Sequence, residues 1–249
     1  MKIGAVIIGD ELLSGKRQDK HFAYVQQALA KRGLELSWTV IVGDEAEQLQ
    51  RFLTFTLNSD DLVFCFGGIG ATPDDRTRQT VAKVLEVELL PHPDAIAEIE
   101  GQFGNMAYPK RILMAELPVG SSIIPNPVNR VPGFTIKYHH FMPGFPEMSW
   151  PMLEWILDTH YPHIKNLAPE VERVIYIQTR ESELLDSMLA IEANYPAVRL
   201  SSLPRIGANP IIEFSLRGPS TDVEIAMNTL IQALDTQGIS WSNQDTAKN

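Results

Sequence analysis

Cysteine is almost absent from this sequence of 249 residues, and its single copy, Cys65, cannot form an internal disulfide. Disulfide-stapled folds are therefore excluded, and a reducing compartment is favoured. No run of 18 apolar residues occurs, so we expect no transmembrane helix. The short apolar run after Met1 lacks the length and cleavage site of a signal peptide. Together these absences predict a cytoplasmic protein.

Basic residues are also in short supply. Lys and Arg number 21 against 31 Asp and Glu, which gives a net charge of -10. A surface of this sign repels phosphate backbones and anionic lipids, so we expect neither nucleic acid nor membrane as a partner. Any phosphate that the protein binds must be held at a local site. The hydrophobic share of 44% and the length indicate a main globular domain with an appendage.

Apolar runs and helical patterns alternate along the first two thirds of the chain. Strands are predicted at 2–8, 34–42 and 62–66, with helices at 19–32, at 44–57 and from residue 72. Short strands near 122–124 and 138–142 and a helix at 146–159 complete the pattern. Such alternation with short connections predicts a three-layer α/β/α domain with a mostly parallel sheet. We expect this domain to span residues 1–161.

The pattern changes after residue 161. Strands are predicted at 173–179, 197–203 and 210–216, and helices at 181–193 and 220–237. This βαββα order is typical of a small α+β domain with helices on one face of an antiparallel sheet. We expect this second domain to span residues 171–240.

Three glycines follow the predicted strand at 62–66, in the run Gly67-Gly68-Ile69-Gly70. Glycines there let the backbone approach a ligand closely, and a helix that follows presents unpaired N–H groups to an anion. Thr72 as N-cap and Asp75 three residues later predict that this helix starts at Thr72. The alternative interpretation is a tight strand-to-helix turn without a ligand.

Carboxylates follow each of the three predicted parallel strands. Asp10-Glu11 come after the first and Asp44 after the second, although Asp44 is also expected to cap a helix, with Glu47 as its capping-box partner. Asp74-Asp75 follow the glycine run. The ends of parallel strands meet at one edge, so we expect these residues to converge, and Asp74 and Asp75 to hold Mg²⁺ together with ligand phosphates.

Five motifs follow one another along the predicted first domain: Gly9–Gly15, Gly43-Asp44, Gly67–Thr77, Ile124–Pro127 and Pro143–Met148. Their residues and order resemble the molybdopterin-binding domain family, which includes MoaB/Mog-type proteins and the N-terminal domain of competence/damage-inducible protein A (CinA). The later two motifs are similar to its CinA branch. The C-terminal segment is similar to the small KH-like domain of CinA proteins, through Thr179-Arg180-Glu181-Ser182.

The resemblance implies a small phosphorylated ligand, either a pterin such as molybdopterin or a nucleotide, and a homo-oligomer of two or three copies. It implies catalytic roles for Asp44 and Asp75. The expected ligand-binding residues are Gly9, Asp10, Glu11, Ser14, Asp19, Gly67, Gly68, Gly70, Thr72, Thr77, Asn126, Pro143, Gly144 and Glu147.

Three functions remain open on this resemblance. A Mog-type protein would transfer an adenylyl group in molybdenum cofactor biosynthesis, whereas a CinA-type protein would use a metal to cleave a dinucleotide pyrophosphate such as ADP-ribose. The third is a non-catalytic ligand sensor or interaction module. It stays open because His21 stands where CinA proteins commonly carry asparagine, and Ala71 stands where the family usually has proline.

Overall fold

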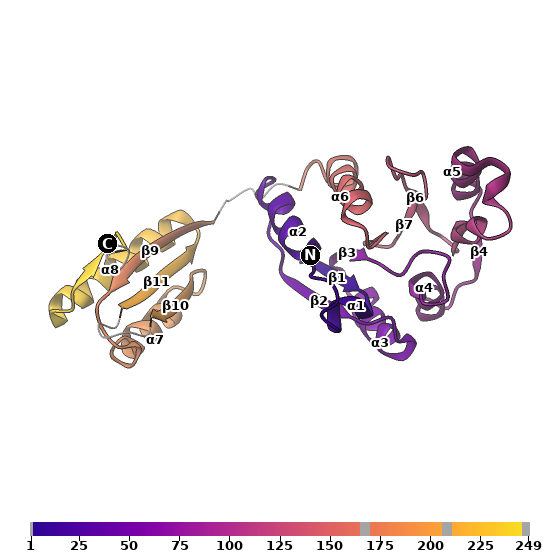
Figure 1. The fold of residues 1–249 in the computed structure, drawn as a ribbon. Coiled ribbons are helices and arrows are strands. Elements are labelled where there is room, and N and C mark those ends of the chain that lie inside the picture. Colours follow the sequence, from indigo (N-terminus) through magenta and orange to yellow (C-terminus); the bar gives the residue numbers. More distant parts are fainter. Residues whose placement is uncertain (1, 165–169, 206–210, 246–249) are drawn as a thin grey trace. The chain divides into compact units, whose positions relative to one another are not determined.

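The structure is a computed structural model that describes residues 2–164, 170–205 and 211–245. The chain divides into two compact units, Met1–Lys165 and Asn166–Asn249, which are drawn in Figure 1 and are described one at a time below. No helix of the described residues is both long and apolar enough to cross a membrane.

A six-stranded sheet forms the centre of the first unit, in the order β2-β1-β3-β8-β7-β6. The first four of these strands run parallel, and β7 and β6 continue the sheet in antiparallel pairing. The predicted mostly parallel sheet is therefore confirmed. The strands are β1 (Ile3–Ile8), β2 (Trp38–Val42), β3 (Leu62–Phe66), β6 (Ser122–Ile124), β7 (Gly133–Ile136) and β8 (His139–Met142).

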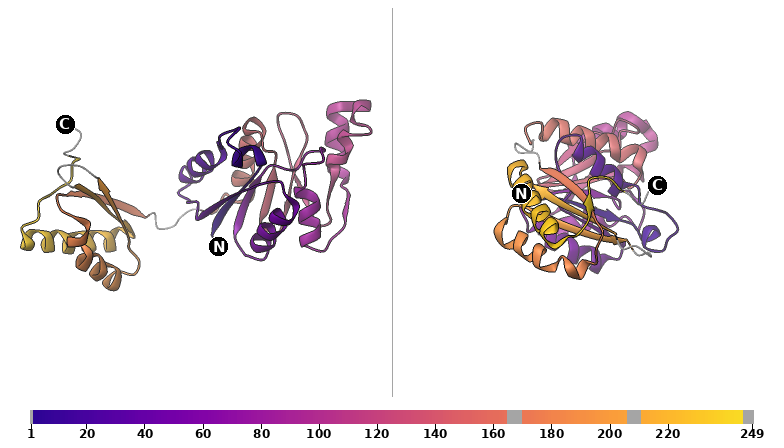
Figure 2. Two further views of the ribbon diagram at one scale, coloured as in Figure 1. Left: turned by 60° about the horizontal axis from the view of Figure 1, so that its bottom comes forward. Right: turned by 90° about the vertical axis from the view of Figure 1, so that its left-hand side faces the viewer.

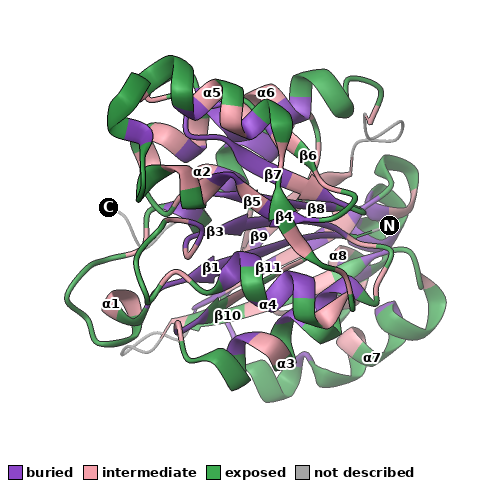
Figure 3. Cartoon of the chain, turned by 90° about the vertical axis from the view of Figure 1, so that its right-hand side faces the viewer, coloured by how far each residue is buried: buried purple, intermediate pink, exposed green. Residues whose placement is uncertain are grey.

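Helices cover both faces of this sheet, which makes the predicted three layers (Figure 1). On one face lie α2 (His21–Ala30) and α6 (Pro146–His160), and on the other lie α3 (Ala46–Leu57) and α4 (Thr77–Val84). Alternate strand residues build two separate cores, because successive side chains of a strand point to opposite faces. Ile7 and Phe64 pack under α2 and α6, whereas Val6 and Cys65 pack under α3 and α4. Figure 3 shows these central strands buried, with the outer surfaces of the helices exposed.

A smaller lobe follows α4 in the chain. It holds a two-stranded antiparallel ribbon, β4 (Leu89–Pro91) with β5 (Glu116–Pro118), and between these strands α5 (Pro93–Phe103) and two 3₁₀ helices. The 3₁₀ helices are η1 (Gly104–Ala107) and η2 (Arg111–Ala115). Buried Ile99 of α5 and Leu117 of β5 extend the core under α3 and α4, so the lobe belongs to that side of the sheet.

The second unit is a four-stranded antiparallel sheet, in the order β10-β11-β9-β12, with both helices on one side (Figure 2). Apolar residues of alternate strand positions, such as Ile175 and Phe214, pack under the helices. The predicted βαββα order is confirmed, and one short strand follows it. The elements are β9 (Val171–Ile177), η3 (Glu181–Glu183), α7 (Leu185–Asn194), β10 (Arg199–Arg205), β11 (Ile211–Gly218), α8 (Ser220–Gln237) and β12 (Trp241–Ser242).

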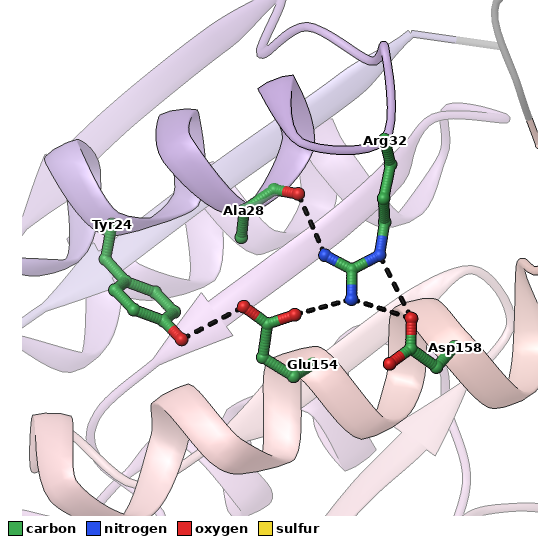
Figure 4. Close-up of polar contacts among 5 residues, drawn as sticks. All are labelled: Tyr24, Ala28, Arg32, Glu154 and Asp158. Carbon is green, nitrogen blue, oxygen red and sulfur yellow. Dashed lines mark hydrogen bonds and ion pairs between the residues drawn. The ribbon is translucent and has the colours of Figure 1, made fainter.

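A polar network joins α2 to α6 on the outside of the first unit (Figure 4). The Arg32 guanidinium contacts Glu154 at 2.5 Å and Asp158 at 2.6 Å, and it also donates to the Ala28 carbonyl at 2.9 Å. Tyr24 donates its hydroxyl to the other oxygen of Glu154 at 3.0 Å. Burial, and then the bond to Glu154, raise the pKa of Tyr24 to about 12. The Arg32 guanidinium thus bonds a carbonyl near the end of α2 and two carboxylates of α6, and these bonds hold the two helices side by side.

We expect Arg32→Met to lower the free energy of unfolding by about 1–2 kcal/mol, since it removes charge-assisted bonds at a partly exposed site. Urea unfolding followed by tryptophan fluorescence measures this, because Trp38, Trp150 and Trp155 lie in the first unit. Lys31→Met, which removes the neighbouring exposed positive charge, is the matched control. Equal losses in both variants would contradict a specific role for the network.

Candidate functional site

The four parallel strands end at one edge of the sheet, and most predicted site residues follow them directly. Asp10 follows β1, Asp44 follows β2, Gly68 follows β3 and Gly144 follows β8. Pairing continues past the strand ends: the N–H of Gly9 donates to Val42 at 3.0 Å, and that of Gly67 donates to Met142 at 2.9 Å. The parallel sheet thus brings residues far apart in the sequence to the same edge.

Asp10 and Asp44 are joined by two reciprocal hydrogen bonds. The Asp10 N–H donates to Asp44 Oδ2 at 3.0 Å, and the Asp44 N–H donates to Asp10 Oδ1 at 3.1 Å. The sequence predicts Asp44 as the N-cap of α3, and this prediction is wrong. Glu45 caps that helix instead, by accepting from the N–H groups of Glu47 and Gln48. The N-cap therefore lies one residue later than predicted, which leaves Asp44 to join the ends of β1 and β2.

The electrostatic environment of Asp44 is unfavourable to its negative charge. Burial is the largest cause that raises its pKa, and the nearby charges of Asp10, Glu11 and Asp74 raise it further, against the lowering effect of the bond from the Asp10 N–H. Like-charged carboxylates gathered beside a ligand loop favour a proton or a cation between them.

The glycine loop at 67–70 is held from the side of α4. Thr77, the first residue of that helix, donates its hydroxyl to the Gly67 carbonyl at 3.1 Å and its N–H to the Gly68 carbonyl at 2.9 Å. Gly67 and Gly68 have φ values of 108° and 68°, which side chains disfavour. A Cβ at Gly68 would also lie 2.3 Å from Thr77 Oγ1. The contact with Thr77 therefore requires glycine at this position.

The N–H groups of residues 68–71, by contrast, point to no acceptor in the described part of the chain. Among the residues that the structure describes, no acceptor is bonded to the N–H of Gly68, Ile69, Gly70 or Ala71. The Gly70 carbonyl is held by the Arg78 guanidinium at 2.6 Å. The loop carbonyls are thus bonded on one side, and the N–H groups of residues 68–71 have no partner among the described residues. Successive unpaired N–H groups of this kind form concavities that bind anions.

The helix after the loop begins later than the sequence predicts. Thr72 and Asp75 form the expected pair: the Asp75 carboxylate accepts from the Thr72 N–H at 3.0 Å and from its hydroxyl at 2.5 Å. The pair closes an isolated turn, however, and α4 starts five residues on, at Thr77. The capping signal was identified correctly, but the chain uses it to shape the loop rather than to start the helix.

A cleft of about 530 Å³ opens at the same edge, on the side of α2 and α6. Four of the predicted ligand residues line it, whereas the glycine loop and Asp44 do not. The N-termini of α2 and α6 both border it, and helix N-termini carry partial positive charge. The lining residues are Ile7, Ile8, Glu11, Leu12, Arg17, Gln18, Asp19, Lys20, His21, Phe66, Gly144, Phe145, Pro146 and Glu147.

His21 forms part of the wall of this cleft and was not predicted as a site residue. Its ring stacks on Phe66 at 4.4 Å, and its Nε2 donates to the Gly144 carbonyl at 3.2 Å. Burial lowers the pKa of His21, so its imidazole is neutral at pH 7. Asp19 accepts from the N–H groups of His21 and Phe22 at 2.9 and 3.0 Å, and so it caps α2. The signal in the sequence was a histidine two residues after the acidic residue that caps this helix.

Two other predicted ligand residues lie apart from both features. Asn126 is buried, and its amide bonds within its own loop, to Asn129 at 2.8 Å, the Val131 carbonyl at 2.9 Å and the Val128 N–H at 3.0 Å. Ser14 lies just after the short helix α1 (Asp10–Leu13), with its side chain exposed. The structure gives Asn126 the role of shaping a loop.

The two predicted metal ligands, Asp74 and Asp75, have different surroundings in the structure. In the described part of the chain, no group of three or more His, Cys, Asp or Glu side chains is arranged to hold a metal ion. Asp75 already accepts two bonds from Thr72, whereas the Asp74 side chain is exposed and near enough to raise the pKa of Asp44. Of the two predicted metal ligands, only Asp74 therefore has an exposed carboxylate, and Mg²⁺ is typically held by one or two carboxylates together with substrate phosphate oxygens.

Comparison with known proteins gives consistent matches. Residues 4–165 match the family model described as "Probable molybdopterin binding domain". A CinA-like protein from Desulfovibrio desulfuricans is 31% identical over 218 residues, covering 85% of this chain and 48% of that protein. A CinA-like protein from Sulfurihydrogenibium sp. is 30% identical over 205 residues, covering 78% and 51%. This chain therefore spans about half the length of these curated relatives.

One solved structure is similar in both sequence and fold. It is the crystal structure of the protein CinA, of unknown function, from Thermoplasma acidophilum. The two share 27% identity with a TM-score of 0.58, and the match covers 63% of this chain and 96% of that one.

The raised pKa of Asp44 predicts a stability difference that depends on pH. Asp44→Asn keeps an oxygen to accept the Asp10 N–H bond but removes the charge. Folding raises this pKa above its ordinary value of 3.8. The ionised carboxylate therefore destabilises the folded state when the pH is above the raised pKa, and this effect is absent when the pH is below 3.8. We expect the variant to be more stable than the wild type at pH 7, with the difference shrinking towards about pH 4.

Urea unfolding at several pH values measures this difference. Asp60→Asn removes an exposed charge outside the cluster and serves as the control. A variant at Asp44 that is less stable than the wild type at pH 7, or a difference independent of pH, would contradict the electrostatic description.

Proposed function

Because the chain belongs to the molybdopterin-binding domain family, we propose that its first unit binds a phosphorylated pterin or a nucleotide at the glycine loop. The observation that carries the proposal is the loop itself. Its three glycine carbonyls are bonded on the side of α4, while the N–H groups of residues 68–71 have no protein acceptor among the described residues. Backbone N–H groups bind phosphate without a basic surface.

The cleft beside the loop supports a ligand with two parts. The phosphate would lie at the loop, and a ring or sugar would enter the cleft of about 530 Å³ between the N-termini of α2 and α6. Phe66 and His21 offer stacked rings in its wall. Pockets of this volume hold small organic ligands.

Asp74 is the residue that would hold a divalent cation together with phosphate oxygens of the ligand, which leaves the Asp44 carboxylate available as a proton acceptor. When bound, such a cation would neutralise charge on the phosphate. The fit rests on carboxylate oxygens, which Mg²⁺ prefers, and on the exposed side chain of Asp74, whose charge is close enough to raise the pKa of Asp44.

Adenylyl transfer is the first candidate reaction. A phosphate oxygen of the pterin would attack the α-phosphorus of ATP, and pyrophosphate would leave with the electron pair of the broken P–O bond. The chain's part is to position the phosphate and to offset its charge at residues 68–71. This reaction requires no basic side chain.

Hydrolysis of a dinucleotide pyrophosphate is the second candidate, and the environment of Asp44 favours it. Water would attack one phosphorus of ADP-ribose, its proton would pass to the Asp44 carboxylate, and the P–O–P bridge would break into AMP and ribose 5-phosphate. A carboxylate with a raised pKa is a better proton acceptor than an ordinary one. Only this reaction uses that property.

We expect Gly68→Val to weaken the binding of ADP-ribose and ATP about tenfold or more, because the new side chain collides with Thr77 and disfavours the φ of 68°. Titration calorimetry measures the dissociation constants. Gly104→Val is the matched control, since Gly104 has a φ of 53° with no atom near its Cβ position. Unchanged binding by the Gly68 variant, or equal losses in both, would overturn the proposed site.

Turnover separates the two reactions from a sensor. With Mg²⁺ or Mn²⁺, AMP released from ADP-ribose and lost in Asp44→Asn would establish the hydrolase. Pyrophosphate released from ATP only with added molybdopterin, and retained in part by Asp44→Asn, would establish the transferase. Binding with neither product would leave the sensor. Asp75→Asn tests whether that carboxylate does more than hold Thr72.

A further inference from the structure

Arg78 lies behind the glycine loop, on the side of α4. It is the second residue of α4, and its side chain is only 3% exposed. Its Nη2 donates to the Gly70 carbonyl at 2.6 Å. Its Nη1 donates to the carbonyls of Leu113 and Glu116, at 2.6 and 2.8 Å, in the lobe that follows α4.

The positive charge of Arg78 has no carboxylate in contact with it. None of the ion pairs among the described residues includes Arg78, and its buried Nε has no hydrogen-bond partner. Glu116 and Asp75 act on it only from a distance, and burial lowers its pKa. A buried charge that has hydrogen bonds to carbonyls but no carboxylate in contact destabilises a fold, which suggests that an anion offsets it in the functional state.

The bond to Gly70 completes a pattern in the loop. Thr77 already holds the carbonyls of Gly67 and Gly68, and Arg78 holds the remaining glycine carbonyl on the same side. A carbonyl oxygen that faced the ligand would repel a phosphate. With all three drawn towards α4, the ligand meets N–H groups backed by a cation.

We propose that Arg78 is a positioning residue for the phosphate loop, which keeps the Gly70 carbonyl away from the ligand and supplies a positive charge that the phosphate offsets. The inference rests on the proposed function. The competing explanation is that Arg78 merely joins α4 to the lobe at 113–116. That role would affect folding but not the affinity of the folded protein for an anion.

The test compares three variants with inorganic pyrophosphate and ADP-ribose as probes. Arg78→Met removes charge and bonds, Arg78→Lys keeps the charge but loses the planar fork, and Lys83→Met removes an exposed charge from the same helix. We expect the dissociation constants to rise about tenfold or more in Arg78→Met, about threefold in Arg78→Lys, and less than about twofold in Lys83→Met. Calorimetry is done at a temperature where circular dichroism shows each variant folded.

Each outcome separates the possibilities. An Arg78→Met protein that melts earlier but binds pyrophosphate within about twofold of the wild type would overturn the inference and leave the proposed function standing. Failure of the wild type to bind either probe would overturn the proposed function itself. If Arg78→Met does not fold, the comparison rests on Arg78→Lys. An affinity equal to that of the wild type would refute the positioning role. A larger loss of affinity in Arg78→Lys than in Lys83→Met would support it.

Discussion

The contact between Thr77 and the carbonyls of Gly67 and Gly68 is the interaction on which the rest of the site depends. One residue at the start of α4 uses both its hydroxyl and its N–H, and in doing so it draws the loop towards the helix. As a result, the N–H groups of residues 68–71 have no acceptor among the residues that the structure describes, and glycine is required at 68 because a side chain would meet the Thr77 hydroxyl. Arg78 extends the same hold to Gly70.

The sheet places two further features around this loop. The reciprocal bonds of Asp10 and Asp44 join the ends of β1 and β2 and gather carboxylates on the side of α3 and α4. On the other side, the Arg32 network aligns α2 with α6, so that the N-termini of both helices border one cleft. His21 links that cleft to the end of β8 through the Gly144 carbonyl. An acidic surface is therefore compatible with the proposed anion site, because the positive potential there comes from backbone N–H groups and a buried guanidinium.

Sequence reasoning predicted the features that depend on local pattern. The buried runs at 2–8 and 62–66 became central strands, and parallel pairing followed from their alternation with helices. It missed β7 and the β4–β5 ribbon, which are three or four residues long and carry no distinctive periodicity. It placed the start of α4 five residues early, because a Thr72–Asp75 pair satisfies the same hydrogen bonds in a turn as in a helix. Arg78 gave no signal at all, since its carbonyl partners lie up to 38 residues away in the chain.

The central claim is that the N–H groups of residues 68–71 receive a phosphate. Nuclear magnetic resonance of the backbone amides tests it most directly, in a titration of the full chain with pyrophosphate. We expect downfield shifts and slowed hydrogen exchange at Gly68, Ile69, Gly70 and Ala71, with smaller changes at the amides of the second unit. Saturable binding that leaves those four amides unchanged and shifts others instead would contradict the account.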